Sequence, residues 1–292
     1  MKKTTTLLSG ILLSMLCSAQ FGYVKKAELE KVKDSRTVVV LNNDSAYNAS
    51  IKMAVEKYWS FTGTVFAYDS ALKPYNKGDF TFLVFSKGKL AKIRAKVNTS
   101  EEDFNGLQLL KKYKRRSPME DVIARSFCSN HIDTVNWQAE LIRAVQLMNN
   151  YFNYAVEAKG DLNPYNYPSD KSLMMNKKLL IPLPSAQTAK SKGKPNAKSD
   201  HILDVQGKVD ANTLLDGEVE EVDRDDIDKA IIAQDQSSMI YFFSVDEKHC
   251  SKLVVTADKS ELMYFETDSP ERCACTVSDL KAMKAAKMKA NK

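Results

Sequence analysis

The run Val38-Val39-Val40-Leu41 constrains the fold of this chain more than any other stretch of its sequence. An uninterrupted row of β-branched and apolar residues is typical of a strand that is buried on both faces. A helix is expected over Asn48–Trp59, where apolar residues recur every three or four positions, with Asn48 as its N-cap. A second strand is expected over Gly63–Asp69. This order predicts an α/β fold in which helices pack on mixed sheets.

A hairpin is predicted next. Its strands are expected over Asp79–Phe85 and Leu90–Val97, with Lys87-Gly88 in the turn between them. Two short helices are then expected, over Gly106–Arg116 and Asp121–Cys128. The clearest helix of the chain follows these elements.

That helix is expected over Val135–Ala158, and Gly160 fits its end. Its apolar positions step by three and four residues and form one stripe: Trp137, Leu141, Val145, Met148, Phe152 and Ala155. The sequence therefore predicts a long amphipathic helix between two halves of the chain.

Strands and helices are expected again in the second half. A short strand over Leu179–Leu183 precedes the stretch 184–200, which carries four lysines and no large apolar residue and is typical of a flexible linker. The elements expected beyond it are a strand at Glu218–Val222, a helix at Asp225–Gln234 capped by Asp223, strands at Ser238–Val245, Ser251–Ala257 and Glu261–Glu266, and a basic helix or tail at Thr276–Lys289.

Part of the second half repeats residues of the first half at a fixed spacing of 154 positions (217 − 63). The matching positions are Gly63, Val65 and Asp69 with Gly217, Val219 and Asp223. In both copies an aromatic-rich strand and a further strand follow. Two interpretations stay open. Either the C-terminal half is a reduced copy that lacks the first strand and helix, or the three identities are a coincidence.

The N-terminus has the features of a secretory signal peptide. Lys2 and Lys3 precede the short apolar run Leu7–Leu16, and Cys17-Ser18-Ala19 offers small residues for cleavage after Ala19. Lipidation at Cys17 is less favoured because Leu16 precedes it. No later segment is apolar enough to span a bilayer. The predicted organisation is a signal peptide at 1–19, an N-terminal α/β unit at 20–183, a basic linker at 184–200, a C-terminal α/β unit at 201–278 and a basic tail at 279–292.

Cleavage would leave four cysteines, Cys128, Cys250, Cys273 and Cys275. An even set in an exported chain is readily explained by disulfides. Cys250 lies between two predicted strands, and a bridge from it to Cys273 or Cys275 would join adjacent elements. The remaining cysteine would pair with Cys128 or stay free. Inert thiols, or a metal or redox role that includes His249, are the alternatives, but neither a zinc spacing nor Cys-x-x-Cys is present.

Catalytic motifs are absent from the sequence. It lacks Gly-x-Ser-x-Gly, His-Glu-x-x-His, and the glycine-rich phosphate and dinucleotide motifs. The three histidines, His131, His201 and His249, are each expected on the surface. The acidic cluster Asp223, Asp225, Asp226 and Asp228 fits the first turn of a helix better than a calcium loop, which would need a glycine. We predict no catalytic, cofactor-binding or metal-binding residue and no cofactor.

The net charge of +6 is too small to indicate a nucleic-acid-binding protein. Two basic runs, Lys111–Arg116 and Lys281–Lys292, fit either solvated faces or contact with an anionic surface. A solvated face is favoured, because Met283 and Met288 give the second run only a weak apolar stripe.

The chain resembles uncharacterised secreted proteins of the Bacteroidota. The similar features are the leader end Cys17-Ser18-Ala19-Gln20, the run Ala54–Trp59, the strand Phe80–Phe85 and the helix Trp137–Tyr154. The resemblance implies export to the periplasm, the outer membrane or the exterior of a Gram-negative cell, and it brings no catalytic residues.

We therefore expect an exported cell-envelope protein that acts as a non-enzymatic binding or assembly module. Its expected partner is another envelope protein or an anionic envelope polymer. The alternative is an exported hydrolase with a site between the two halves.

Overall fold

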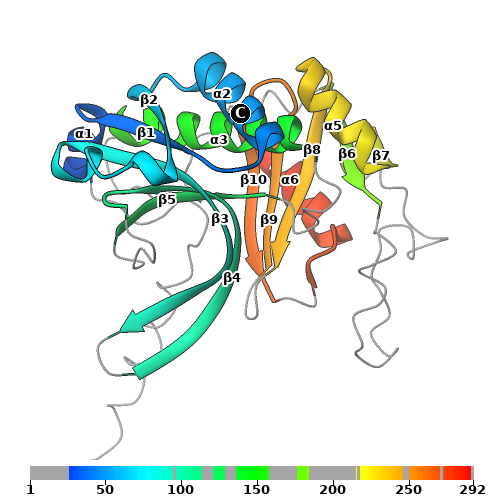
Figure 1. Ribbon diagram of the computed structural model, residues 1–292. Helices are drawn as coiled ribbons and strands as arrows, with labels where there is room; N and C mark the ends of the chain where they lie inside the picture. The colour runs from blue at the N-terminus through cyan, green and yellow to red at the C-terminus, as the bar shows by residue number, and fades with distance from the viewer. Residues whose placement is uncertain are drawn as a thin grey trace, which may run out of the picture.

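The structure is a computed structural model that describes residues 26–94, 97–113, 121–128, 136–157, 176–183, 215, 218–245, 250–269 and 272–290. The described part is an α/β fold with two five-stranded mixed sheets. Its α-helices are α1 (Lys26–Lys33), α2 (Ser45–Tyr58), α3 (Trp137–Glu157), α5 (Arg224–Ala233) and α6 (Val277–Ala290). In Figure 1, α1, α2, α3 and α5 lie together along one side of the molecule, with both sheets beneath them.

The first sheet has the strand order β2-β1-β3-β4-β5. Its strands are β1 (Arg36–Leu41), β2 (Gly63–Tyr68), β3 (Phe80–Arg94), β4 (Val97–Leu110) and β5 (Val122–Phe127). β1 is parallel to both of its neighbours, whereas β3, β4 and β5 are antiparallel. Two 3₁₀ turns, Asp69–Ala71 and Tyr75–Lys77, connect β2 to β3. The five apolar and polar side chains from Thr37 to Leu41 are buried, as expected for a central strand.

The second sheet follows the same plan, with the order β7-β6-β8-β9-β10. Its strands are β6 (Lys178–Pro182), β7 (Val219–Val222), β8 (Ser238–Val245), β9 (Cys250–Thr256) and β10 (Leu262–Asp268). β6 is parallel to β7 and β8, and the last three strands are antiparallel. The fold therefore consists of two similar units: the first is β1–β5 with α1, α2 and α3, and the second is β6–β10 with α5 and α6.

The position of β6 changes the predicted organisation. The strand expected over Leu179–Leu183 was assigned to the N-terminal unit, but it pairs with β7 and β8 in the second sheet. It is the counterpart of β1, which was expected to have no counterpart in the second half. The boundary expected between residues 183 and 184 therefore does not separate the two sheets. The expected leader 1–19 and linker 184–200 lie outside the described residues.

Three local predictions in the first unit were wrong. Gly106–Leu110 belongs to β4 and Asp121–Cys128 contains β5, although both stretches were expected to be helical. Segments of five or six residues are too short to separate a period of 2 from one of 3.6. Lys87-Gly88 lies inside β3 and not in a turn, because β3 and β4 pair as far as Arg94 and Val97.

The N-cap of α2 is Asp44 and not Asn48. The Asp44 carboxylate accepts hydrogen bonds from the backbone N–H groups of Ala46 (2.9 Å) and Tyr47 (3.0 Å), so the helix begins at Ser45. Asn48 lies one turn inside the helix, where its side-chain amide bonds both backbone groups of Asn42. The other predicted helices, Val135–Ala158 and Asp225–Gln234, are confirmed as α3 and α5.

One hydrophobic core joins the two units. It contains side chains from the inner face of the first sheet (Val39, Leu41, Leu83, Leu107, Leu109), from α3 (Leu141, Val145, Met148, Phe152) and from the second unit (Ile231, Ile240, Leu253, Val255). On the outer face of the second sheet, Leu280 and Met283 of α6 pack against Met239, Tyr241 and Val254. α3 therefore serves both units, which explains why it is buried along most of its length.

β3 and β4 extend well beyond their neighbours. β3 pairs with β1 only from Phe80 to Leu83, and β4 pairs with β5 only from Gly106 to Leu110. Beyond these points the two strands pair only with each other among the described strands, and Figure 1 shows them curving away from the body. We call residues 84–94 and 97–105 the arm. Gly106 lies at its base, where a Cβ would come within 2.1 Å of the Ser126 carbonyl oxygen.

Candidate functional site

α3 carries a polar stripe that faces the second unit. Glu140, Arg143, Gln146 and Asn150 follow one another at spacings of three and four residues, so they lie on one side of the helix. Each of the four contacts a residue of the second unit. The apolar stripe of α3 was predicted from the sequence, but this second stripe was not. Its regular spacing is the signal that could have revealed it.

The first part of the stripe is a buried ionic cluster. Glu140 accepts hydrogen bonds from Arg143 (2.8 Å) and from Arg224 of α5, and Arg224 also donates to Asp228 (3.0 Å). The guanidinium carbons of Arg143 and Arg224 lie 4.3 and 5.6 Å from the ring centre of Phe242. Burial raises the pKa of the Asp228 carboxyl, and the nearby Arg224 opposes this shift. Two cations and two carboxylates thus balance one another between the units.

Gln146 continues the stripe with three hydrogen bonds to the second unit. Its amide donates to Gln234 Oε1 and to the Asp258 carbonyl oxygen, both at 3.0 Å, and it accepts from the Ser260 hydroxyl at 2.8 Å. Gln234 and Ser260 both have positive φ angles, 54° and 52°. Non-glycine residues adopt this conformation at a cost, so the surrounding contacts must hold it. Gln146 contacts both residues and so helps to hold these two backbone conformations. We call the contact between α3 and the second unit the seam.

Two neighbouring asparagines bind opposite units. The Asn149 side-chain oxygen accepts from the backbone N–H groups of Ser60 (2.8 Å) and Phe61 (3.1 Å) in the first unit. Asn150 donates to the Lys259 carbonyl oxygen (2.8 Å) in the second unit. The end of α2 and the β9–β10 turn are therefore both fixed to α3.

A depression of about 440 Å³ lies at this end of the seam. Its lining comes from both units: Glu56, Lys57, Tyr58, Trp59, Ser60, Gln146, Asn150, Lys259 and Glu261. Carboxylates, ammonium groups and amides line the same hollow, which suits a small polar ligand better than an apolar one. This depression is the candidate binding site between the two halves.

The cysteines are divided between one bridge and two buried thiols. Cys250 and Cys273 form a disulfide with a Cα–Cα distance of 5.4 Å, which ties the start of β9 to the segment before α6. Cys128 and Cys275 are free and buried. Of the two expected bridges from Cys250, the one to Cys273 is present. The alternative in which Cys128 pairs with the remaining cysteine is not.

Reduction of the Cys250–Cys273 bridge should lower the free energy of unfolding by about 3 kcal/mol, because the bridge closes a loop of 23 residues in the unfolded chain. The measurement is urea denaturation of the full chain with and without reductant. A Cys128→Ser variant is the control and should respond to reductant as the wild type does. Equal stability of the oxidised and reduced chains would contradict the prediction.

The free thiols should be unreactive in the folded chain. Burial raises the pKa of the Cys128 thiol to about 12, from an ordinary value of 9.0, and it also raises the pKa of Cys275. Because only the unfolded chain ionises near pH 9, stability is complete below that pH and falls by up to about 1.4 kcal/mol per pH unit for each thiol as pH rises toward 12. Alkylation of both thiols at pH 8 should follow global unfolding. Rapid labelling of the native chain would contradict this expectation.

The other residues singled out from the sequence hold no common site in the described structure. Asp223 is the N-cap residue of α5, Asp226 pairs with Lys229 at 2.8 Å, and Asp228 belongs to the ionic cluster. Among the described residues, no group of three or more His, Cys, Asp and Glu side chains is placed to hold a metal ion. His131, His201 and His249 lie outside the described residues.

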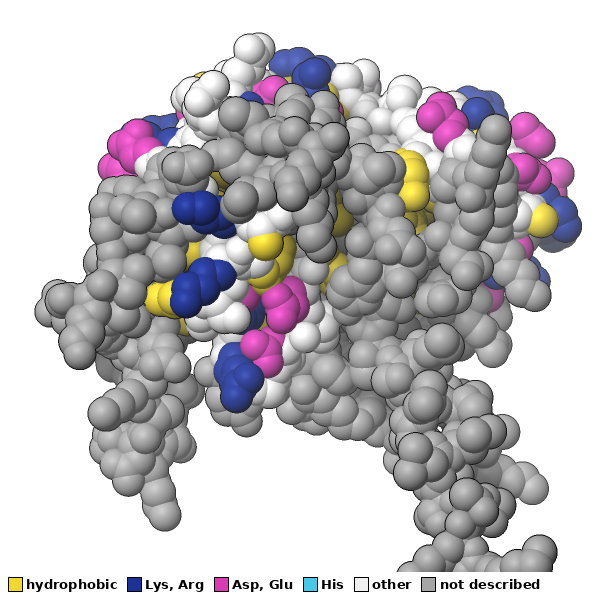
Figure 2. All heavy atoms as spheres, turned by 180° about the vertical axis from the view of Figure 1, so that it is seen from behind, with side chains coloured by type: hydrophobic (Ala, Val, Ile, Leu, Met, Phe, Trp, Pro, Cys, Tyr) yellow, Lys and Arg dark blue, Asp and Glu magenta, His cyan; other side chains and the backbone are white. Residues whose placement is uncertain are grey.

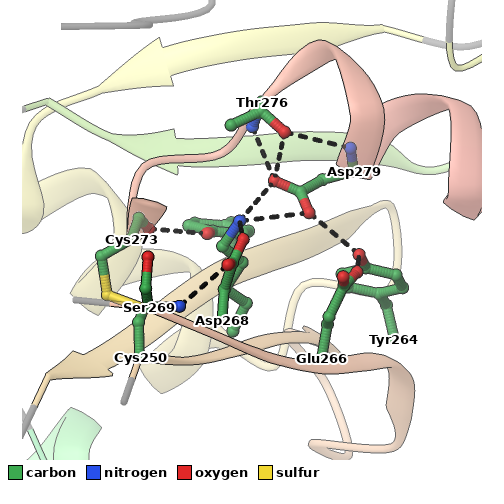
Figure 3. Close-up of polar contacts among 10 residues, drawn as sticks. Cys250, Tyr264, Glu266, Asp268, Ser269, Cys273, Thr276 and Asp279 are labelled. Atoms are coloured by element: carbon green, nitrogen blue, oxygen red, sulfur yellow. Dashed lines mark hydrogen bonds and ion pairs between the residues drawn. A yellow bond between two sulfur atoms is a disulfide. The ribbon is translucent and has the colours of Figure 1, made fainter. Parts of the chain in front are cut away.

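A second polar cluster surrounds Lys252, a β9 residue that is 1% exposed (Figure 3). Its ammonium nitrogen lies 3.0 and 3.3 Å from the two carboxylate oxygens of Asp279 and 3.4 Å from Asp268 Oδ2. Asp279 Oδ2 also accepts from the Thr276 backbone N–H (2.7 Å) and hydroxyl (2.8 Å), which makes a capping box at the start of α6. We call Lys252, Tyr264, Glu266, Asp268, Thr276 and Asp279 the lysine corner.

The lysine corner was not predicted from the sequence. Thr276-x-x-Asp279 is a capping pattern at the start of a predicted helix, so the contact between these two residues could have been predicted. Lys252 gave no signal, because a single lysine in a strand is usually on the solvent face.

The face seen in Figure 2, which is turned by 180° from Figure 1, carries charges of both signs. In Figure 2 the acidic and basic side chains of the described residues are interspersed, without one large face of a single sign. Within the described ranges, no helix combines the length and apolar character needed to span a bilayer. Comparison of the chain with protein-family models, curated proteins and solved structures found no match.

Proposed function

We propose that the chain is an exported cell-envelope protein that acts as a non-enzymatic assembly module, with the arm as its contact element. One observation carries the proposal: over residues 86–94 and 97–104 of the arm, each strand pairs on one side only among the described strands. Unpaired strand edges present free N–H and C=O groups, and these are the groups that bind a further strand.

The charges of the arm favour a second copy of this chain as the partner. The β3 part carries Lys87, Lys89, Lys92 and Arg94, whereas the β4 part carries Glu101, Glu102 and Asp103. Pairing of two β3 edges, or of two β4 edges, would place like charges together. Pairing of β3 in one copy with β4 in another would bring opposite charges together. Such a head-to-tail contact repeats from copy to copy and builds a chain of molecules.

Light scattering on the purified mature chain tests this proposal. The average mass should rise with concentration for the wild type. It should stay that of a monomer for a variant in which residues 88–104 are replaced by Asn-Gly, a short hairpin turn. A monomer at every concentration, together with identical captures from an envelope extract by both proteins, would overturn the proposal. Arm-dependent capture of a different protein would replace the second copy as partner.

A matched variant separates the charge pattern from the presence of the arm. Lys89 and Asp103 are directly opposite in the arm, so the double exchange Lys89→Asp with Asp103→Lys keeps an opposite-charge pair within one copy. Each edge then carries a mixed charge. We expect weaker association than for the wild type, while the circular dichroism spectrum stays unchanged.

Export is part of the same proposal and has its own test. The leader features at residues 1–19 support it, as does the disulfide, since bridges of this kind persist in oxidising compartments. Chain recovered from the envelope fraction of its host should begin at Gln20. A cytosolic chain that begins at Met1 would contradict export.

The depression at the seam favours a second function, that of an exported hydrolase. Glu56 and Glu261 reach the same hollow from the two units, and paired carboxylates are the groups that glycoside hydrolysis uses. If so, the single changes Glu56→Gln and Glu261→Gln would each remove a glycosidase activity of the wild type. Lack of turnover across a panel of envelope glycans would remove this alternative.

A further inference from the structure

The lysine corner contains three carboxyl groups, those of Glu266, Asp268 and Asp279, but only one amine, that of Lys252. Lys252 faces Asp279 and Asp268, and the Tyr264 hydroxyl lies between Asp279 Oδ1 (2.9 Å) and Glu266 Oε2. Three carboxyl groups therefore gather around one ammonium group and one phenol. The buried amine nitrogen of Lys252 lies 3.0 Å from Asp279 Oδ2.

We propose that Lys252 and Asp279 become joined by an intramolecular isopeptide bond, formed within the folded chain. Lys252 Nζ bonds to Asp279 Cγ, and the bond from Cγ to Oδ1 breaks. The two protons that leave the ammonium depart with Oδ1 as water. No oxidant, reductant or co-substrate is consumed, and the product is a neutral amide between β9 and α6.

The corner holds a group for each requirement of this reaction. Asp268 is placed to take a proton from Nζ, which makes the amine nucleophilic. The Thr276 N–H and hydroxyl both point at Asp279 Oδ2, where negative charge collects when Cγ becomes tetrahedral. Tyr264 lies beside Oδ1, the oxygen that must leave with protons. Burial and the contact with Glu266 raise the pKa of Tyr264, so the phenol remains a proton donor.

Burial supports both the rate and the product. Lys252 is 1% exposed and Asp279 2%, so little water reaches the amide to hydrolyse it. The backbone holds the amine and the carboxyl group in contact, which replaces an encounter in solution by a reaction within one molecule. The Cys250–Cys273 bridge ties β9 to the segment just before α6, and Cys250 lies two positions before Lys252. The corner would then be cross-linked twice.

Mass spectrometry of the full mature chain decides the proposal. After reduction and denaturation, the wild-type mass should be lower by one water than the mass of its sequence. Digestion of the reduced, alkylated chain should release the peptides that contain Lys252 and Asp279 as one joined species. A full-length mass without loss of water, with both peptides separate after prolonged incubation of the folded protein, would reduce the corner to an ion pair.

Variants assign the bond to its atoms. Lys252→Arg should have the full mass of its sequence, without loss of water. Asp279→Asn should form the same amide, with loss of ammonia in place of water. Tyr264→Phe should slow the appearance of the joined peptide at least tenfold. Lys259→Arg, an exposed change in the β9–β10 turn, is the matched control and should react as the wild type does. If Lys252→Arg does not fold, the wild-type peptide map still decides.

Discussion

Replacement of Glu140 by alanine should lower the free energy of unfolding by about 3–5 kcal/mol. The side chain of Glu140 is 1% exposed and is shared by Arg143, which is 4% exposed, and by Arg224. Its removal leaves two guanidinium groups against Phe242 without their common carboxylate. Arg224 is 34% exposed and keeps Asp228, so the loss falls mainly on the buried Arg143, where water cannot replace the carboxylate, and it should exceed that of an exposed ion pair several-fold. Urea denaturation followed by circular dichroism measures it.

Two further variants test the reason for this loss. Glu157→Ala lies at the exposed end of the same helix and should change stability by less than about 0.5 kcal/mol. A joint replacement of Glu140, Arg143 and Arg224 by leucine or methionine should recover most of the loss, because it removes the buried charges together with their need for partners. Stability of Glu140→Ala within about 1 kcal/mol of wild type would mean that the arginines reach solvent.

The sequence predicted the parts of the fold that depend on a single element. β1 is a continuous apolar run and α3 has a strong helical period, and the structure places these two elements, β2 and β8 within two residues of their expected bounds. The internal repeat stays a prediction that rests on three identities at a spacing of 154 residues, and the expected reduced copy without a first strand was wrong, because β6 holds the place of β1 in the second sheet. β6 was assigned to the wrong half, because a five-residue apolar strand contains no information about the sheet that it joins.

The candidate sites could not be predicted because they depend on contacts across the fold. Gln146 meets Ser260 from 114 residues away, and Glu140 meets Arg224 from 84 residues away. A polar residue in a helix normally indicates the solvent side, so Glu140 and Gln146 were not distinguished from surface positions. Lys252 and Asp279 are only 27 residues apart, but their burial depends on how α6 covers the second sheet. Only the cysteines were predicted from their residue type, because cysteines in an oxidising compartment commonly form disulfides.

Replacement of Asp279 by alanine should also cost about 3–5 kcal/mol, and in this case the effect concerns the attachment of α6. The change removes both carboxylate contacts of Lys252, the bond from Tyr264 and the capping box with Thr276. Loss of the cap alone accounts for about 1 kcal/mol, and the buried lysine accounts for the rest. Ser278→Ala is the matched control: Ser278 is an exposed residue beside Asp279 in the first turn of α6, so its replacement should change stability by less than about 0.5 kcal/mol.

Asp279→Asn then distinguishes the two states of the lysine corner in the same denaturation experiment. If the pair is only ionic, asparagine removes the charge that balances Lys252, and stability should fall nearly as far as in Asp279→Ala. If the amide forms, asparagine reaches the same product, and stability should stay close to that of the wild type. Equal stability of Asp279→Ala and Ser278→Ala would contradict both descriptions, because Asp279 would then contribute no more than its exposed neighbour.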